Sequence, residues 1–149
     1  MKRILDSPAL AIAVFAFLLN LPWEFLQMQL YANIPTMSHR TGIDICLLAT
    51  VGDAVIMLGA YAVVALASKS WIWIRVPRTP QVIGFVLIGL VVSVVIEAMA
   101  TRADGVIQWR YAATMPMIPV LGVGLAPILQ WLILPPLVLW FAGRHLGRR

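Results

Sequence analysis

Charged side chains are scarce in this sequence. They make up 11% of its 149 residues, whereas about 25% is usual in a soluble domain. Apolar side chains make up 62%, so a water-soluble domain of this length would have too little polar surface. The composition therefore excludes a cytosolic enzyme, a secreted disulfide-linked domain and a disordered chain. It predicts an integral membrane protein, with apolar residues enough for about four spans of roughly 20–23 residues each.

Cysteine and histidine are also rare. The single cysteine, Cys46, cannot form an intramolecular disulfide, which excludes a cysteine-based metal site and a c-type haem attachment. The two histidines, His39 and His145, are expected at opposite ends of the spans, where they cannot share a metal ion. We therefore predict no cofactor and no metal. The net charge of +5 is expected to face anionic membrane lipid, with no nucleic acid as partner.

Four apolar segments are separated by polar or proline-rich linkers. They cover about residues 8–31, 43–67, 82–100 and 117–141, lengths that suit membrane spans. All four must be helices, because an open strand would leave backbone groups unpaired in lipid. The first run has no small-residue cleavage site after it, so we expect a retained span rather than a signal peptide. The prediction is an all-α, single-domain bundle of four transmembrane helices.

The basic residues predict the orientation of this bundle. Most of them fall on one side of the spans: Lys2, Arg3, Lys69, Arg75, Arg78, Arg144, Arg148 and Arg149. The other side carries Arg40, Arg102 and Arg110. Cytoplasmic loops are the richer in Lys and Arg, so both termini are expected in the cytoplasm, and a bacterial inner membrane is the expected location. The linker from Lys69 to Pro80 is predicted to lie at the cytoplasmic interface, with Trp71 and Trp73 at headgroup depth.

The first span carries a polar stripe. Asn20, Glu24, Gln27 and Tyr31 fall within an arc of roughly 60° at about 100° per residue. The small residues Ala9, Ala13 and Ala16 continue this face toward the cytoplasmic end, and Trp23 flanks it. Pro22 has no N–H, so the carbonyl of Leu18 loses its helical partner and a kink is expected there.

Each of the other spans adds a polar side chain. Asp53 lies in the second span, Glu97 in the third and Gln130 in the fourth, one turn after Pro127, where a second kink is expected. At 1.5 Å per residue, Glu24, Asp53 and Glu97 lie about 10, 15 and 6 Å from the outer ends of their spans. A charge within a span costs about 2.5–3.5 kcal/mol and usually marks function. One cavity in the outer half of the membrane is therefore predicted, with the connecting segment from Thr101 to Pro116 as its lid.

The predicted ligand-binding residues are Asn20, Trp23, Glu24, Gln27, Tyr31, Asp53, Glu97, Trp109, Arg110, Tyr111 and Gln130. For several of them a structural role is an open alternative. Gln27, Gln130 and also Ser93 could simply lock helices together by hydrogen bonds. The tryptophans could belong to an interfacial belt, and Arg110 could either pair with an acid or anchor the interface.

The first predicted function is binding or transport of a small molecule or cation. In it, Glu24 is protonated when the site is empty and ionised when a cation is bound. Four short helices with a glutamate in the first resemble the small multidrug transporters in outline, and that resemblance implies proton-coupled exchange. The chain departs from them because Asp53, Glu97 and Gln130 add further polarity within the spans.

The second predicted function is an intramembrane enzyme of isomerase, hydratase or hydrolase type, acting on a lipid or isoprenoid. Two carboxyl groups in a partly dry cavity can divide into acid and base. The topology and outer acid pair are similar to those of the lipoprotein signal peptidases, whose Asp-Arg and Asn-x-Ala-Asp sequences are missing here. Buried acids combined with tryptophans also resemble the sterol isomerase-like membrane proteins. In that resemblance, anions and aromatic faces stabilise a carbocation.

The third predicted function is an accessory subunit that docks a partner helix. The small-residue edge formed by Ala9, Ala13 and Ala16 would suit close approach of another helix. The same small faces and the interfacial aromatics fit a monomer and a homodimer equally.

Overall fold

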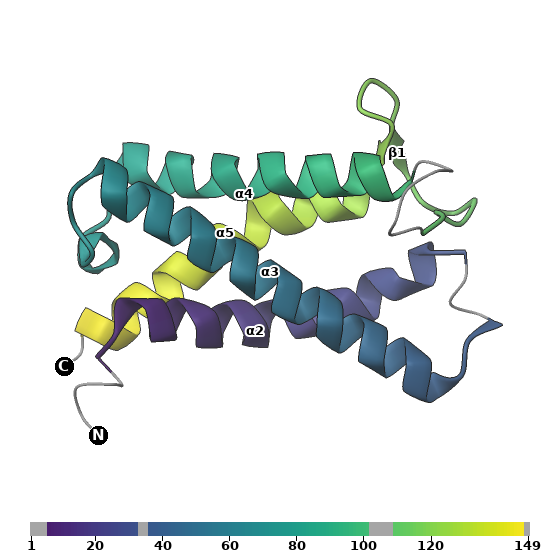
Figure 1. Ribbon diagram of the computed structural model, residues 1–149, viewed down its shortest axis with the longest axis horizontal. Coiled ribbons are helices and arrows are strands. Elements are labelled where there is room, and N and C mark those ends of the chain that lie inside the picture. Colours follow the sequence, from purple (N-terminus) through teal and green to yellow (C-terminus); the bar gives the residue numbers. More distant parts are fainter. Residues whose placement is uncertain (1–5, 33–35, 102–108, 148–149) are drawn as a thin grey trace.

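The computed structural model describes residues 6–32, 36–101 and 109–147. Within these ranges it contains four helices that are long and apolar enough to cross a membrane. They are α2 (Pro8–Gln27), α3 (His39–Ala67), α4 (Thr79–Ala100) and α5 (Leu125–Gly147), and they lie alongside one another in a bundle (Figure 1). The start of α2 and the end of α5 lie at the same end of this bundle. The length and apolar composition agree with a membrane protein.

Side-chain caps explain why three helices begin where they do. Ser7 accepts a hydrogen bond from the Leu10 N–H at 3.4 Å, directly before Pro8 at the first helical position. Ser38 accepts from the Thr41 N–H at 3.2 Å, so α3 starts before the apolar run that was expected to open it. The Gln81 side chain accepts from the Arg78 N–H at 2.8 Å at the start of α4. Such bonds satisfy backbone donors that have no partner within the helix.

The fourth helix begins later than predicted: the expected start at about residue 117 is wrong, and α5 begins at Leu125. Residues 117–124 form a hairpin of β1 (Met117–Ile118) and β2 (Val123–Gly124), in which Met117 pairs with Gly124. Gly122 has a φ of +66° at the turn, a conformation that glycine adopts without strain. The segment is apolar enough to look like part of a span, but its proline and glycine residues favour a turn.

The predicted kink at Pro127 is also displaced. Pro127 lies in the first turn of α5, where a helix tolerates proline because the missing N–H would have no partner there. Pro135 and Pro136 lie further along α5, and the ribbon of this helix changes direction along its course (Figure 1). Prolines within a helix are the usual cause of such a bend.

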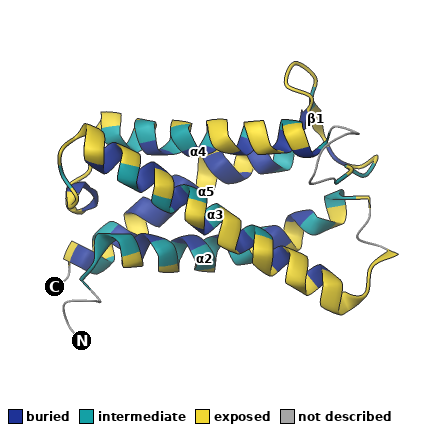
Figure 2. Cartoon of the chain, viewed as in Figure 1, coloured by how far each residue is buried: buried dark blue, intermediate teal, exposed yellow. Residues whose placement is uncertain are grey.

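The apolar core lies mainly toward the end where α2 starts and α5 ends. Its fully buried members include Ile12, Met57, Phe85, Trp131 and Val138. Figure 2 shows buried residues facing the interior and exposed residues facing outward. Many exposed positions carry large apolar side chains, such as Leu48 at 74% and Leu66 at 66% exposed. These outer faces suit a lipid environment better than water.

Two side chains near this core differ from the sequence prediction. Trp73, in the short helix η3 (Trp73–Arg75), is only 3% exposed and packs against Tyr61 and Phe85, so its ring belongs to the core and not to the exposed surface. Trp71 is 55% exposed, and its carbonyl accepts a hydrogen bond from the Tyr61 hydroxyl. Ala16 is fully buried in the core, so part of the small-residue edge already packs against this chain's own helices.

Candidate functional site

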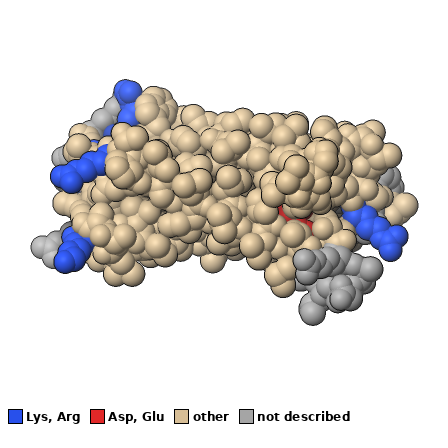
Figure 3. Space-filling view, turned by 90° about the horizontal axis from the view of Figure 1, so that it is seen from above, with Lys and Arg blue, Asp and Glu red and all other residues tan. Residues whose placement is uncertain are grey.

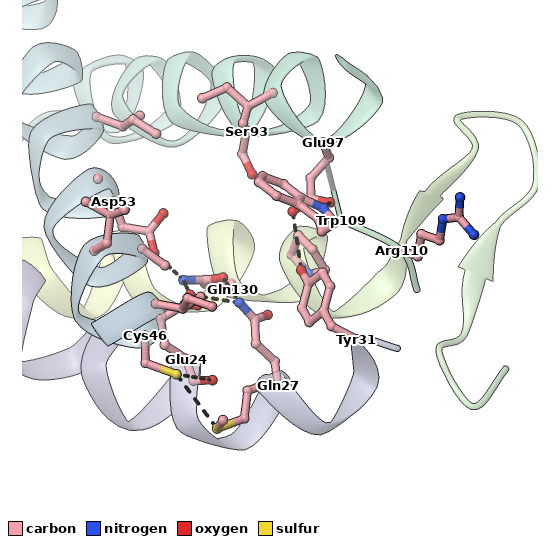
Figure 4. A pocket seen from close by; sticks show the side chains of 18 of the residues that line it. Glu24, Gln27, Tyr31, Cys46, Asp53, Ser93, Glu97, Trp109, Arg110 and Gln130 are labelled. Atoms are coloured by element: carbon pink, nitrogen blue, oxygen red, sulfur yellow. Dashed lines mark hydrogen bonds between the residues drawn. The ribbon is translucent and has the colours of Figure 1, made fainter. Parts of the chain in front are cut away.

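A cavity of about 500 Å³ lies among the four helices. It is at the end of the bundle opposite the start of α2 and the end of α5. Its polar lining residues are Glu24, Gln27, Tyr31, Asp53, Ser93, Glu97, Trp109, Arg110 and Gln130 (Figure 4). Figure 3 shows acidic atoms at the bottom of a recess toward this end of the molecule. The cavity thus has carboxyl groups from α2, α3 and α4 in one space, as the sequence predicts.

The Gln130 side chain forms the centre of the deeper polar cluster. Its amide nitrogen lies 2.9 Å from Asn20 Oδ1, 2.9 Å from Glu24 Oε1 and 2.7 Å from Asp53 Oδ2. An amide has only two N–H groups, so these three acceptors share them. One side chain of α5 therefore holds polar groups of α2 and α3 together.

The donors in this cluster follow one another from Trp23, through Gln27, to Glu24 and Gln130. The Trp23 indole N–H donates to Gln27 Oε1 at 3.0 Å, which leaves the Gln27 amide nitrogen to face inward. That nitrogen donates to Glu24 Oε1 at 2.7 Å and to Gln130 Oε1 at 3.2 Å. Asn20 donates to the carbonyl of Ala16 at 2.8 Å, so its oxygen faces Gln130. Because an indole nitrogen only donates, Trp23 fixes the amide orientations, and the donors converge on the carboxyl groups.

Glu24 and Asp53 form a carboxyl pair that meets at one amide: Gln130 Nε2 lies 2.9 Å from Glu24 Oε1 and 2.7 Å from Asp53 Oδ2. Glu24 is 8% exposed and Asp53 is half-buried. Two ionised carboxylates can only accept hydrogen bonds, and they repel each other where the dielectric constant is low. A proton on one of them relieves this repulsion, and so does a cation in the cavity.

Glu97 belongs to a second cluster nearer the end of the bundle. Its Oε2 accepts from the Trp109 indole at 3.0 Å and from the Tyr111 hydroxyl, and its Oε1 accepts from the Tyr31 hydroxyl at 3.4 Å. Burial raises the pKa of the Tyr111 phenol, and the bond to Glu97 acts in the same direction. Tyr111 therefore stays protonated near neutral pH and serves as a donor. Glu97 is held entirely as an acceptor by aromatic side chains.

The segment that carries Trp109 and Tyr111 is hydrogen-bonded to residues that follow α2, in and just after the short helix η1 (Met28–Leu30). The Ala32 N–H donates to the Arg110 carbonyl at 2.8 Å, and the Ala112 N–H donates to the Leu30 carbonyl at 2.9 Å. The Tyr31 and Tyr111 rings also contact each other, with centroids 5.6 Å apart. Trp109 and Arg110 of this segment line the cavity, so the described part of the predicted lid lies beside it. Arg102 and Asp104, which the sequence places in the same connection, lie outside the described residues.

Arg110 differs from the other predicted site residues. It is exposed, and Figure 4 shows its guanidinium directed away from the labelled carboxyl groups. It therefore does not pair with one of the buried acids, which was one of its two expected roles. No other lysine or arginine lines the cavity among the described residues.

Ser93 has a larger place in the cavity than the sequence suggested. It is 8% exposed, and its hydroxyl is directed into the cavity between Asp53 and Glu97 (Figure 4). Within the described part of the chain this hydroxyl has no hydrogen-bond partner, so it does not lock two helices together. The sequence does indicate this position, because a spacing of four residues places Ser93 and Glu97 on the same face of α4.

The described residues contain no group of three or more His, Cys, Asp or Glu side chains placed to hold a metal ion. Glu97 stands apart from the Glu24–Asp53 pair because its oxygens are engaged by Tyr31, Trp109 and Tyr111. No family model, curated protein or solved structure matches this chain. Its function is therefore inferred from the chemistry of the cavity.

Proposed function

We propose that this chain is a four-span protein of a bacterial inner membrane that binds, and moves between sides or leaflets, a small molecule or cation. The ligand occupies the cavity and replaces the proton shared by Glu24 and Asp53, which passes to water. The observation that carries this proposal is that Glu24 and Asp53 both lie against the Gln130 amide and line a cavity of about 500 Å³. That volume is within the range of about 300–1,000 Å³ found for ligand pockets.

The proposed orientation has both termini in the cytoplasm and the cavity in the outer half of the membrane. Lys69, Arg75, Arg78 and Arg144 belong to the end where α2 starts and α5 ends, whereas Arg40 and Arg110 belong to the cavity end. On the face drawn in Figure 3, basic side chains lie at the two ends of the molecule. The excess of Lys and Arg at one end supports placing that end in the cytoplasm.

A purely structural role would not require the carboxyl pair. Asn20, Gln27 and Gln130 already supply amide donors and acceptors that can join helices, and each such bond contributes about 0.6 kcal/mol on average in a membrane. Two further acids add a desolvation cost without adding a needed link. Their value is a proton that can be exchanged for a ligand.

The test measures binding of octylamine to the protein in lipid vesicles as a function of pH. If binding releases the shared proton, the dissociation constant falls about tenfold for each unit of rising pH while the pair holds that proton. Glu24→Gln removes this slope, whereas Asp44→Asn, which changes an exposed carboxylate on the same protein, keeps it. A slope that is unchanged in Glu24→Gln would contradict the proposal.

An intramembrane enzyme acting on a lipid or isoprenoid is the second candidate. The observation that favours it is that the carboxyl groups have different surroundings. Glu24 and Asp53 both lie against the Gln130 amide, whereas Glu97 is an acceptor for three aromatic donors. Such differences separate acid and base roles in one site. Chemical change of a lipid incubated with the wild type, and no change with Asp53→Asn, would support this reading over transport.

A further inference from the structure

The cavity reaches the outer flank of the bundle between α3 and α4. Ile45, Leu48 and Ile96 line the cavity, and they are also 40%, 74% and 38% exposed on the surface of the molecule. Figure 1 shows α3 and α4 diverging toward this end of the bundle. Gly52, another lining residue, is exposed and has no atom within 4 Å of where a Cβ would lie. The cavity therefore has a sideways opening with apolar edges.

This opening faces the hydrocarbon when the four helices cross a membrane. Open apolar edges at that depth contact acyl chains rather than water. The cavity wall is also apolar, with Ala49, Ile56 and Pro127 among its lining residues. A ligand with an apolar chain can thus pass from the bilayer into the cavity without exposing that chain to water.

The polar groups inside select the other end of the ligand. Ser93 has an unpartnered hydroxyl directed into the cavity and is 8% exposed. Asp53 also lines the cavity and lies apart from Ser93 (Figure 4), on the side of the Gln130 amide. Three carboxyl groups and no inward-facing described cation disfavour an anion, because like charges repel strongly where the dielectric constant is low. The favoured ligand end is a hydrogen-bond donor.

We propose that the cavity takes a single-chain amphiphile whose end donates hydrogen bonds, a long-chain alcohol or amine, directly from the bilayer through the α3–α4 opening. The donating end lies between Ser93 and Asp53, and the chain lies against Leu48, Ile56 and Ile96. This inference rests on the proposed function, because it uses the same carboxyl pair. It adds the substrate class and its route of entry.

The test uses photoactivatable hexadecanol, hexadecylamine and hexadecanoate with the full-length protein in vesicles. We expect the alcohol or the amine to label peptides of α3 and α4, and hexadecanoate to label them at least about tenfold less. The alcohol and amine arms show whether the recognised end is neutral or cationic. Equal labelling by hexadecanoate would overturn the inference, because a carboxylate end would then be accepted.

Two glycine variants test the route. Gly52→Phe places a ring in the opening, and we expect labelling to fall at least about tenfold. Gly59→Phe is the matched control, because Gly59 lies on the same helix, is exposed and also has no atom within 4 Å of a Cβ. Unchanged labelling in Gly52→Phe would overturn lateral entry. Circular dichroism of both variants shows whether the helices are retained.

Failure of this inference can be told apart from failure of the proposed function. If octylamine still binds with proton release but Gly52→Phe has no effect on the long-chain probes, only the lateral route is wrong. If neither octylamine nor any long-chain probe binds the wild type, the proposed function is wrong and this inference falls with it.

Discussion

Gln130 is the residue on which the deeper polar cluster depends. Its amide contacts Asn20, Gln27, Glu24 and Asp53, so it links α5 to both α2 and α3. An unsatisfied buried polar group costs about 1–3 kcal/mol. Removing this amide takes a donor from Asn20 Oδ1 and from Asp53 Oδ2, and leaves Glu24 with the Gln27 amide as its donor.

Gln130→Leu is therefore expected to lower the free energy of unfolding by about 2–3 kcal/mol. Denaturant unfolding of the purified protein in detergent, followed by circular dichroism, measures the change. Leu129→Met is the matched control, since Leu129 is the neighbouring residue and is 38% exposed. A Gln130→Leu protein as stable as this control would show that the amide contributes little to helix association.

At the scale of the element, α4 and α5 approach each other closely where Gly89 meets Trp131. A Cβ added to Gly89 would lie 2.1 Å from a ring carbon of Trp131. Trp131 is 1% exposed and belongs to the apolar core, so the indole has little room to move. The absence of a side chain at position 89 allows the two helices to pack at this distance.

Gly89→Ala is expected to destabilise the bundle by about 1–3 kcal/mol, because overpacking forces side chains or helices apart. Gly59→Ala is the comparison, since a Cβ there meets no atom within 4 Å. Thermal unfolding of both variants in the same detergent measures the difference. Equal melting temperatures for the two variants would mean that the contact between α4 and α5 is looser than the structure indicates.

Helical periodicity predicted which faces are buried. Asn20, Glu24 and Gln27 are all buried on one face of α2, and Ser93 and Glu97 are both buried on α4. This part is predictable because spacings of three and four residues place side chains together whatever the helix packs against. The exposed position of Asp44, on the face opposite Asp53, follows from the same rule.

Apolar content did not predict the structure of the segments between the long helices. Residues 117–124 form a hairpin although they are apolar, and Trp73 is buried against Tyr61 rather than exposed. The hairpin depends on local turn residues, to which apolar content is blind. The burial of Trp73 depends on contacts with other elements, which periodicity does not contain. The direction of the Arg110 side chain and the unpartnered Ser93 hydroxyl also depend on such contacts.

At the scale of the whole molecule, the proposal requires a defined orientation in the membrane. Thr36 and Lys69 are exposed at opposite ends of α3. Cys46 is 2% exposed, so it is expected to react slowly with thiol reagents, and Cys46→Ala removes it. In that background, Thr36→Cys is expected to react with a membrane-impermeant reagent in intact cells, and Lys69→Cys only after permeabilisation.

The reverse labelling pattern would place the cavity on the cytoplasmic side. Labelling of both positions in intact cells would instead show that the two ends of α3 are not separated by the membrane. Either result would change the side from which a water-soluble ligand reaches the carboxyl pair. The hydrogen bonds within the cavity would be unaffected.

The most direct test of the central claim is difference infrared spectroscopy of the protein in vesicles, recorded on adding octylamine. A protonated carboxyl group has a C=O stretch separate from those of carboxylates and amides, so the proton shared by Glu24 and Asp53 can be observed itself. We predict that this band is lost from the wild type on amine binding, and that no such loss occurs in Glu24→Gln or Asp53→Asn. Amine binding to the wild type without loss of a protonated carboxyl band would contradict the claim that the ligand takes the place of that proton.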